Sequence, residues 1–242
     1  MTGRSDRLDT ALGWMDRGSE FFLAQLAELS DEQLAGPSRL PEWSRLHVVS
    51  HMAHNARALM NLLEWARTGI ETPMYPSPEH RRDDIEAGAK LPAPEVRQDA
   101  LEAATALSAT IEAMPETAWS APIRTALGRP VDATEVPWMR VREVWVHGVD
   151  LGASATFADI DAPVAAALLE EAVARFSGRQ DCPAVVLMVE PDQGGRYSIG
   201  PASSDALEVH GTTQDLAGWL LGRTAGAGIE GPGPLPDLPV WL

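Results

Sequence analysis

Apolar residues recur at helical spacing through most of the first 150 residues. In the first segment one face carries residues three or four positions apart, all apolar except Ser19: Leu8, Leu12, Met15, Ser19, Phe22, Leu26 and Leu29. This spacing is typical of an amphipathic helix that buries one face in a bundle. Similar patterns cover residues 44–68, 94–114 and 137–151, and a shorter one starts near Arg81. We therefore predict a bundle of helices for the N-terminal part.

Residues that favour turns separate these helical patterns. SDEQ at 30–33 is a capping-box pattern, which predicts a short helical turn. The segment 72–80 contains three prolines and predicts a loop, while Gly69 marks the end of the helix before it. Residues 115–136 have few apolar repeats and predict an irregular connection. Pro137 then suits the first turn of the next helix.

The pattern changes after Gly152 and becomes mixed. It predicts a helix at 162–178, strands at 184–190, 196–200 and 206–211, a turn at PDQGGR (191–196), and a closing helix capped by Thr212. The last residues, from 226 onward, are too rich in Gly and Pro for regular structure. We expect a mainly α protein with a helical domain at 1–153 and a small α+β domain at 154–242.

Composition narrows the class of protein. Hydrophobic residues make up 45% of the 242 residues, enough for a globular core. The net charge of −16 disfavours nucleic acid as a partner, because an acidic surface repels phosphates. The chain has no apolar run long enough for a membrane span and no apolar signal core, so we expect a soluble, cytoplasmic protein. Its single Cys182 excludes an intrachain disulfide and a multi-cysteine metal site.

Two polar clusters carry the candidate chemistry. Glu143 and His147 stand four residues apart in VREVWVHGVDL, so a helix places them one turn apart on one face. His47, His51 and His54 share a ridge of the helix at 44–68, with His51 at its centre. Two histidines and one carboxylate give zinc three protein ligands and leave the fourth position open. An open position indicates chemistry at the metal and not a structural role.

A simpler interpretation is a surface ion pair between Glu143 and His147, since such pairs are common on helices. Against it, the stretch around them is apolar, with Val141, Val144, Trp145, Val146 and Val149. A buried charge needs a partner, and a metal ion is a strong one. Asp150 continues the polar face and could orient a ligand histidine, as could His47 or His54.

Three stretches carry a family resemblance. WSRLHVVSHMAHNARALMNLLEWARTGI resembles a helix signature of the mycothiol-dependent maleylpyruvate isomerases, which belong to the DinB-like metal-binding superfamily. VREVWVHGVDLG resembles the signature of their later helix, and DLAGWLLGR with LPVWL resembles their C-terminal end. The match covers nearly the whole chain in the same order. It implies a DinB-like four-helix bundle followed by a small α+β domain.

The resemblance also implies a set of site residues. The zinc ligands of the family fall on His51, Glu143 and His147. Its carboxylate-binding catalytic arginine matches Arg223 in WLLGR, which by position alone could equally be a residue favoured by the helix dipole. A second ligand-binding arginine, after the Pro-rich loop, matches Arg81 or Arg82, and the doublet leaves this choice open.

The implied reaction is the cis–trans isomerisation of maleylpyruvate to fumarylpyruvate, with Zn²⁺ and mycothiol as cofactors. A thiolate that adds reversibly to the conjugated alkene turns a rigid double bond into a rotatable single bond. The expected partners are a small dicarboxylate keto acid and a low-molecular-weight thiol. The alternatives are a mycothiol-dependent S-transferase or detoxification enzyme, and a non-catalytic metal-binding regulator. A regulator would more often use cysteines, whereas Cys182 stands alone.

Overall fold

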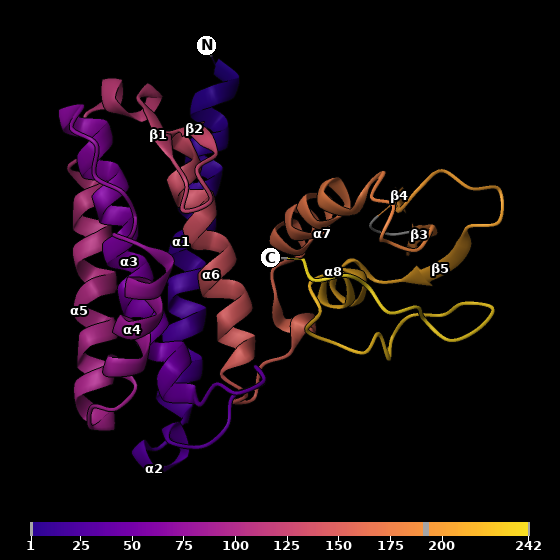
Figure 1. The fold of residues 1–242 in the computed structure, drawn as a ribbon, viewed down its shortest axis with the longest axis horizontal. Coiled ribbons are helices and arrows are strands. Elements are labelled where there is room, and N and C mark those ends of the chain that lie inside the picture. The colour runs from indigo at the N-terminus through magenta and orange to yellow at the C-terminus, as the bar shows by residue number, and fades with distance from the viewer. Residues whose placement is uncertain (1, 191–193, 242) are drawn as a thin grey trace. The chain divides into compact units, whose positions relative to one another are not determined.

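The computed structural model describes residues 2–190 and 194–241. The chain divides into two compact units, Met1–Ser154 and Ala155–Leu242. The first is built of helices, and the second combines helices with a small sheet (Figure 1). The predicted fold class, mainly α with a helical bundle before an α+β part, is therefore confirmed. None of the described helices is both long and apolar enough to span a membrane.

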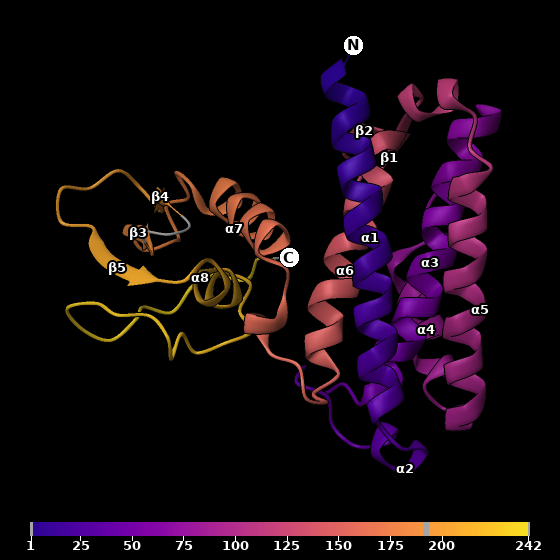
Figure 2. The same cartoon turned by 180° about the vertical axis from the view of Figure 1, so that it is seen from behind.

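The first unit is a bundle of four long helices, which run side by side (Figures 1 and 2). They are α1 (Thr2–Glu28), α3 (Arg45–Thr68), α5 (Ala93–Glu112) and α6 (Val136–Asp150). Helix α1 packs against α6, and α3 packs against both α5 and α6. Four of the seven largest fully buried side chains described in this unit lie on α3; the seven are Leu34, Met52, Leu59, Leu62, Leu63, Ile123 and Leu151. Helix α3 thus forms the centre of the core, as its apolar ridge predicted.

The predicted helix ends agree with the structure at two places. Ser30 forms a capping box at the short α2 (Asp31–Leu34). Ser44 caps α3, and Gly69 ends that helix with a φ of 73°, a left-handed conformation that glycine adopts without a steric penalty. Ser44 and Gly69 thus define the two ends of α3.

Two predictions for the connections were wrong in part. The Pro-rich loop was expected to reach residue 80, but α4 (Pro78–Gly88) already begins at Pro78, with Ser77 as its N-cap. Proline suits that position because the first helical N–H has no partner within the helix anyway. The stretch 115–136 was expected to be irregular, but it holds a small antiparallel hairpin of β1 (Pro122–Arg124) and β2 (Pro130–Asp132).

The second unit contains a three-stranded sheet and two helices. Its elements are α7 (Ala162–Phe176), β3 (Val185–Val189), β4 (Gly195–Ile199), β5 (Leu207–Gly211) and α8 (Thr213–Leu220). The central strand β3 pairs antiparallel with β4 and parallel with β5. Helices α7 and α8 pack together, α7 also against β4 and α8 against β3. These elements match the predicted ones, while residues 191–193 of the expected turn lie outside the described residues.

Candidate metal centre

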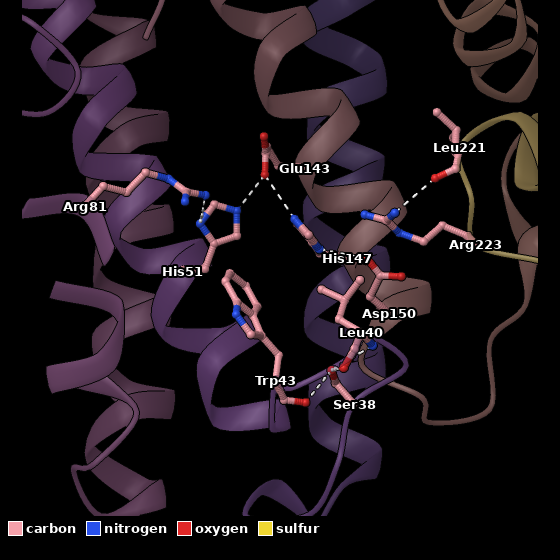
Figure 3. Close-up of polar contacts among 10 residues, drawn as sticks. All are labelled: Ser38, Leu40, Trp43, His51, Arg81, Glu143, His147, Asp150, Leu221 and Arg223. Atoms are coloured by element: carbon pink, nitrogen blue, oxygen red, sulfur yellow. Dashed lines mark hydrogen bonds and ion pairs between the residues drawn. The ribbon is translucent and has the colours of Figure 1, made fainter. Parts of the chain in front are cut away.

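Three predicted ligands converge inside the helical bundle. His51 comes from the first third of α3, and Glu143 and His147 come from α6 (Figure 3). Glu143 Oε2 lies 2.8 Å from His51 Nε2 and 3.3 Å from His147 Nε2. One ligand atom from each residue lies within 4.8 Å of the other two. Residues 92 positions apart in the sequence thus meet at one point of the bundle.

Local helix geometry accounts for this convergence. A four-residue separation on α6 puts the side chains of Glu143 and His147 one above the other. The packing of α3 on α6 brings His51 to the same level. The His51 ring is 2% exposed, and it meets Trp43 and His147 edge-on, with ring centroids 5.7 Å and 4.9 Å away. The histidine is therefore held in one orientation by its neighbours.

The protonation of His147 follows from its two carboxylate neighbours. Its Nδ1 donates a hydrogen bond to Asp150 Oδ2 at 2.9 Å, and Nε2 faces Glu143. Burial lowers the pKa of His147, but the hydrogen bonds to Asp150 and Glu143 outweigh it and raise the pKa to about 9. Without a bound metal ion, His147 is therefore an imidazolium at neutral pH.

His51, in contrast to His147, is neutral. Arg81 can only donate, and its Nη2 lies 3.4 Å from His51 Nδ1, so this nitrogen accepts and Nε2 donates to Glu143. Burial lowers the pKa of His51 to about 4, despite its hydrogen bond to Glu143. Burial also opposes ionisation of Glu143, but hydrogen bonds from His147 and His51 hold its pKa well below the usual range. The centre therefore combines a neutral histidine, an imidazolium and a carboxylate.

The donor set and its spacing fit a zinc ion. Zinc binds histidine nitrogen and carboxylate oxygen at about 2.0–2.2 Å in a tetrahedron, so its ligand atoms lie roughly 3.4 Å apart. The separations of 2.8 Å and 3.3 Å are close to that value. Asp150 supports His147 from behind, as carboxylates commonly do for metal-bound histidines. Three protein ligands would leave the fourth position open.

The structure distinguishes between the two candidate arginines of α4. Arg81 reaches His51, and its guanidinium lies over the ring of Tyr75, 5.7 Å from the centroid. Arg82 is exposed, and in the described part of the chain it is not brought to the cluster. Figure 3 shows the Arg81 side chain extended toward His51. Of the doublet, only Arg81 is placed to act at this centre.

Arg223 belongs to the second unit. It follows α8, and its Nη1 donates to the backbone carbonyl of Leu221 at 3.0 Å (Figure 3). That bond lies near the end of a helix, as the simpler interpretation of this arginine expects. A role of Arg223 in binding a carboxylate stays a prediction.

The other two histidines of α3 have different partners. His47 Nδ1 accepts a hydrogen bond from the backbone N–H of Ser44 at 3.2 Å, and its Nε2 lies 3.4 Å from Glu86. It thus belongs to the cap at the start of α3. His54 is half-buried on the side of Asp84, and burial lowers its pKa. Neither is part of the three-residue cluster.

Two residues near the centre had not been predicted. Arg140 is buried on α6, one turn before Glu143, and Tyr75 lies beside Arg81 in the Pro-rich loop. The signal for Arg140 was available, since it is a charged residue three positions before Glu143 and therefore lies on the same face of the helix. For Tyr75 the sequence offers no comparable signal, because its position depends on the path of the loop.

Comparisons with known proteins agree with this geometry. A model of the mycothiol maleylpyruvate isomerase N-terminal domain matches residues 15–152, and the model of the C-terminal domain of that family matches residues 159–239. A search of curated proteins finds no match. Among solved structures, a crystal structure of a mycothiol-dependent maleylpyruvate isomerase is 36% identical, with a TM-score of 0.92 and 97% of each chain covered.

A second crystal structure, of a variant of such an isomerase with one histidine replaced by alanine, is 35% identical. Its TM-score is 0.91, and 97% of each chain is covered. Both the family models and these structures extend over the helical bundle and the α+β unit. The chain therefore belongs to the mycothiol maleylpyruvate isomerase family.

Proposed function

We propose that this protein is a zinc- and mycothiol-dependent isomerase that converts maleylpyruvate to fumarylpyruvate. The observation that carries the proposal is the convergence of His51, Glu143 and His147, with ligand atoms within 4.8 Å of one another. The likeness to isomerases over 97% of the chain supports the same conclusion. Small molecules are accordingly its substrates, namely a dicarboxylate keto acid and a low-molecular-weight thiol.

His51 Nε2, Glu143 Oε2 and His147 Nε2 would hold the zinc ion. The bound ion and the mycothiol thiol would together supply a thiolate, whose reversible addition permits rotation about the former double bond. Asp150 fixes the His147 ring so that Nε2 points to the ion. The edge-on ring of Trp43 packs against the His51 ring and limits its rotation.

Two arginines would bind the anionic substrate. Arg81 lies at the centre already, where its fork of N–H donors suits a carboxylate and stabilises the enolate charge that develops during addition. Arg223 is proposed to bind a second carboxylate as a catalytic residue. Its change to alanine is expected to preserve zinc content and weaken substrate use. Unchanged kinetics would remove Arg223 from the site.

Metal analysis combined with an isomerase assay tests the proposal. The purified protein is expected to contain about one zinc ion per chain and to isomerise maleylpyruvate only when mycothiol is added. His51→Ala and His147→Ala should each lose both zinc and activity. His54→Ala is the matched control, because it lies on the same helix outside the cluster, and it should keep both.

Two results would contradict the proposal. Full activity in zinc-free variants would exclude the metal from the mechanism. A stable thioether product in place of fumarylpyruvate would instead indicate an S-transferase that uses the same centre.

A further inference from the structure

Arg140 is a buried cation whose hydrogen bonds go to neutral groups. It lies on α6 one helical turn before Glu143, and it is 3% exposed. Buried charges in proteins are normally paired with an opposite charge. In the described part of the chain, the hydrogen bonds of Arg140 go instead to two neutral oxygens. A cation in this position is costly, so its presence calls for a function.

Both hydrogen bonds cross from α6 to α3 at the level of the metal centre. Arg140 Nη1 donates to the backbone carbonyl of Met52 at 3.0 Å and to Asn55 Oδ1 at 2.8 Å. Met52 directly follows His51, and Asn55 lies one turn further along the same helix. One nitrogen of Arg140 therefore ties the backbone beside one proposed ligand to the helix that carries the other two.

This tie matters because the centre is assembled across two helices. The distance between His51 Nε2 and Glu143 Oε2 is set by the spacing and the axial register of α3 and α6. Apolar contacts alone permit small sliding motions of packed helices. Hydrogen bonds to a fixed carbonyl and to Asn55 define one register, since a shift of about 1 Å would break them.

The charge of Arg140 acts on the same centre. Burial lowers its pKa to about 10, so the side chain is still a cation at neutral pH, and the negative charge of Glu143 favours that cation. The attraction is mutual, and it helps to keep Glu143 as a carboxylate. The positive charge of Arg140 would also stabilise the further negative charge that a thiolate brings to the centre.

We propose that Arg140 is a positioning residue, which fixes α3 against α6 so that His51 and Glu143 meet at ligand distance. It acts through the ligands and does not itself touch the metal. This inference rests on the proposed zinc centre, and it predicts that Arg140 controls zinc affinity in addition to any effect on folding.

Zinc affinity of purified variants, measured by competition with a chromophoric chelator, tests the proposal. Arg140→Met keeps the unbranched apolar stem of the side chain but removes the charge and the donors, and it should weaken zinc binding by at least about tenfold, as loss of a supporting contact does. Arg140→Lys keeps the charge but not the planar fork, and it should lose less, about threefold or more. The visible spectrum of cobalt-loaded Arg140→Met should also shift, because ligand geometry changes.

A matched control is available on α3, the helix that Arg140 contacts. Arg57 on α3 also ties two helices together, through Asp99 on α5, but it lies away from the centre. Arg57→Met should therefore leave zinc affinity within about twofold of the parent and leave the cobalt spectrum unchanged. A general loosening of the bundle would affect both variants alike.

Each result of these measurements either supports or overturns the proposed role of Arg140. A folded Arg140→Met variant, judged by circular dichroism, that binds zinc within twofold of the parent would overturn the proposal. If that variant does not fold, Arg140→Lys decides, and unchanged affinity there overturns it. A parent protein that isomerises without binding zinc would contradict the proposed function itself, and with it this inference.

Discussion

Asp150 accepts a hydrogen bond from Nδ1 of His147 at 2.9 Å, and this contact determines which nitrogen of the ring is available to a metal. The Asp150 carboxylate is fully buried and lies three residues after His147 on the same helix. With Nδ1 held, only Nε2 points toward Glu143 and His51. The pair is thus the support on which one of the three proposed ligand bonds depends.

Replacement of Asp150 by alanine is expected to weaken zinc binding by about 10–100-fold, because the His147 ring loses its orientation and part of its basicity. Asp150→Asn should lose less, since an amide oxygen can still accept from Nδ1. Chelator competition on the two purified variants provides the measurement. Equal affinities for parent and Asp150→Ala would show that this carboxylate does not support the metal.

Zinc affinity should increase with pH up to about pH 9. His147 holds a proton below its pKa of about 9, and Nε2 must give up that proton to bind a metal. Binding therefore releases one proton below pH 9 and none above it. His51, with a pKa of about 4, is neutral over the same range, so its Nε2 proton would move to Nδ1 on metal binding and no further proton would be released.

The apparent affinity should accordingly rise about tenfold per pH unit from pH 6 to pH 8 and level off above about pH 9. Chelator competition at several pH values, corrected for the chelator, measures this slope. Proton release on zinc addition in weakly buffered solution provides an independent count. A flat profile between pH 6 and pH 8 would contradict the protonated state of His147.

Arg81 and Arg82 should differ sharply when each is changed to alanine. Arg81 contacts His51, whereas Arg82 is exposed, so only Arg81→Ala removes a group from the centre. We expect the kcat/KM of the isomerase reaction to fall at least about tenfold in Arg81→Ala, which corresponds to about 1.4 kcal/mol. Arg82→Ala serves as the matched control and should change it less than twofold. Equal losses in both variants would contradict the assignment.

The part of the metal cluster on α6 could be predicted from the sequence because helix geometry determines it. A four-residue spacing places Glu143 and His147 on one face wherever the helix lies, and α3 carries its histidines on one ridge. The choice between Arg81 and Arg82 could not be made in this way. Adjacent residues on a helix point about 100° apart, so the choice depends on how α4 is rotated, which its packing on α3 sets.

Arg140 and the hairpin at 122–132 show two further limits of prediction from the sequence. The bonds from Arg140 to Met52 and Asn55 depend on the register between α6 and α3, which neither segment encodes by itself. The two hairpin strands are three residues long, too short for an alternating pattern to stand out. In both cases the information lies in tertiary packing and not in local spacing.

Close packing of α1 on α6 requires glycine at position 18. A Cβ added to Gly18 would lie 2.5 Å from Trp145 Nε1 and 2.5 Å from Val144 Cγ2, and both side chains are buried. Trp145 Nε1 also donates to the carbonyl of Trp14 at 3.0 Å, so the indole cannot move without losing that bond. Gly18→Ala should therefore lower the free energy of unfolding by about 1–3 kcal/mol.

Gly13 is the matched control, on the same helix but with only Arg17 Nη1 within 4 Å of an added Cβ, at 3.7 Å. Gly13→Ala should raise the free energy of unfolding by about 0.5–1 kcal/mol, because alanine loses less conformational entropy in a helix. Urea unfolding of both variants at pH 7 measures the two changes. Opposite signs are expected because the space available differs at the two sites, while the helix and the chemical change are the same. A stabilising Gly18→Ala would show that α1 and α6 can separate without cost.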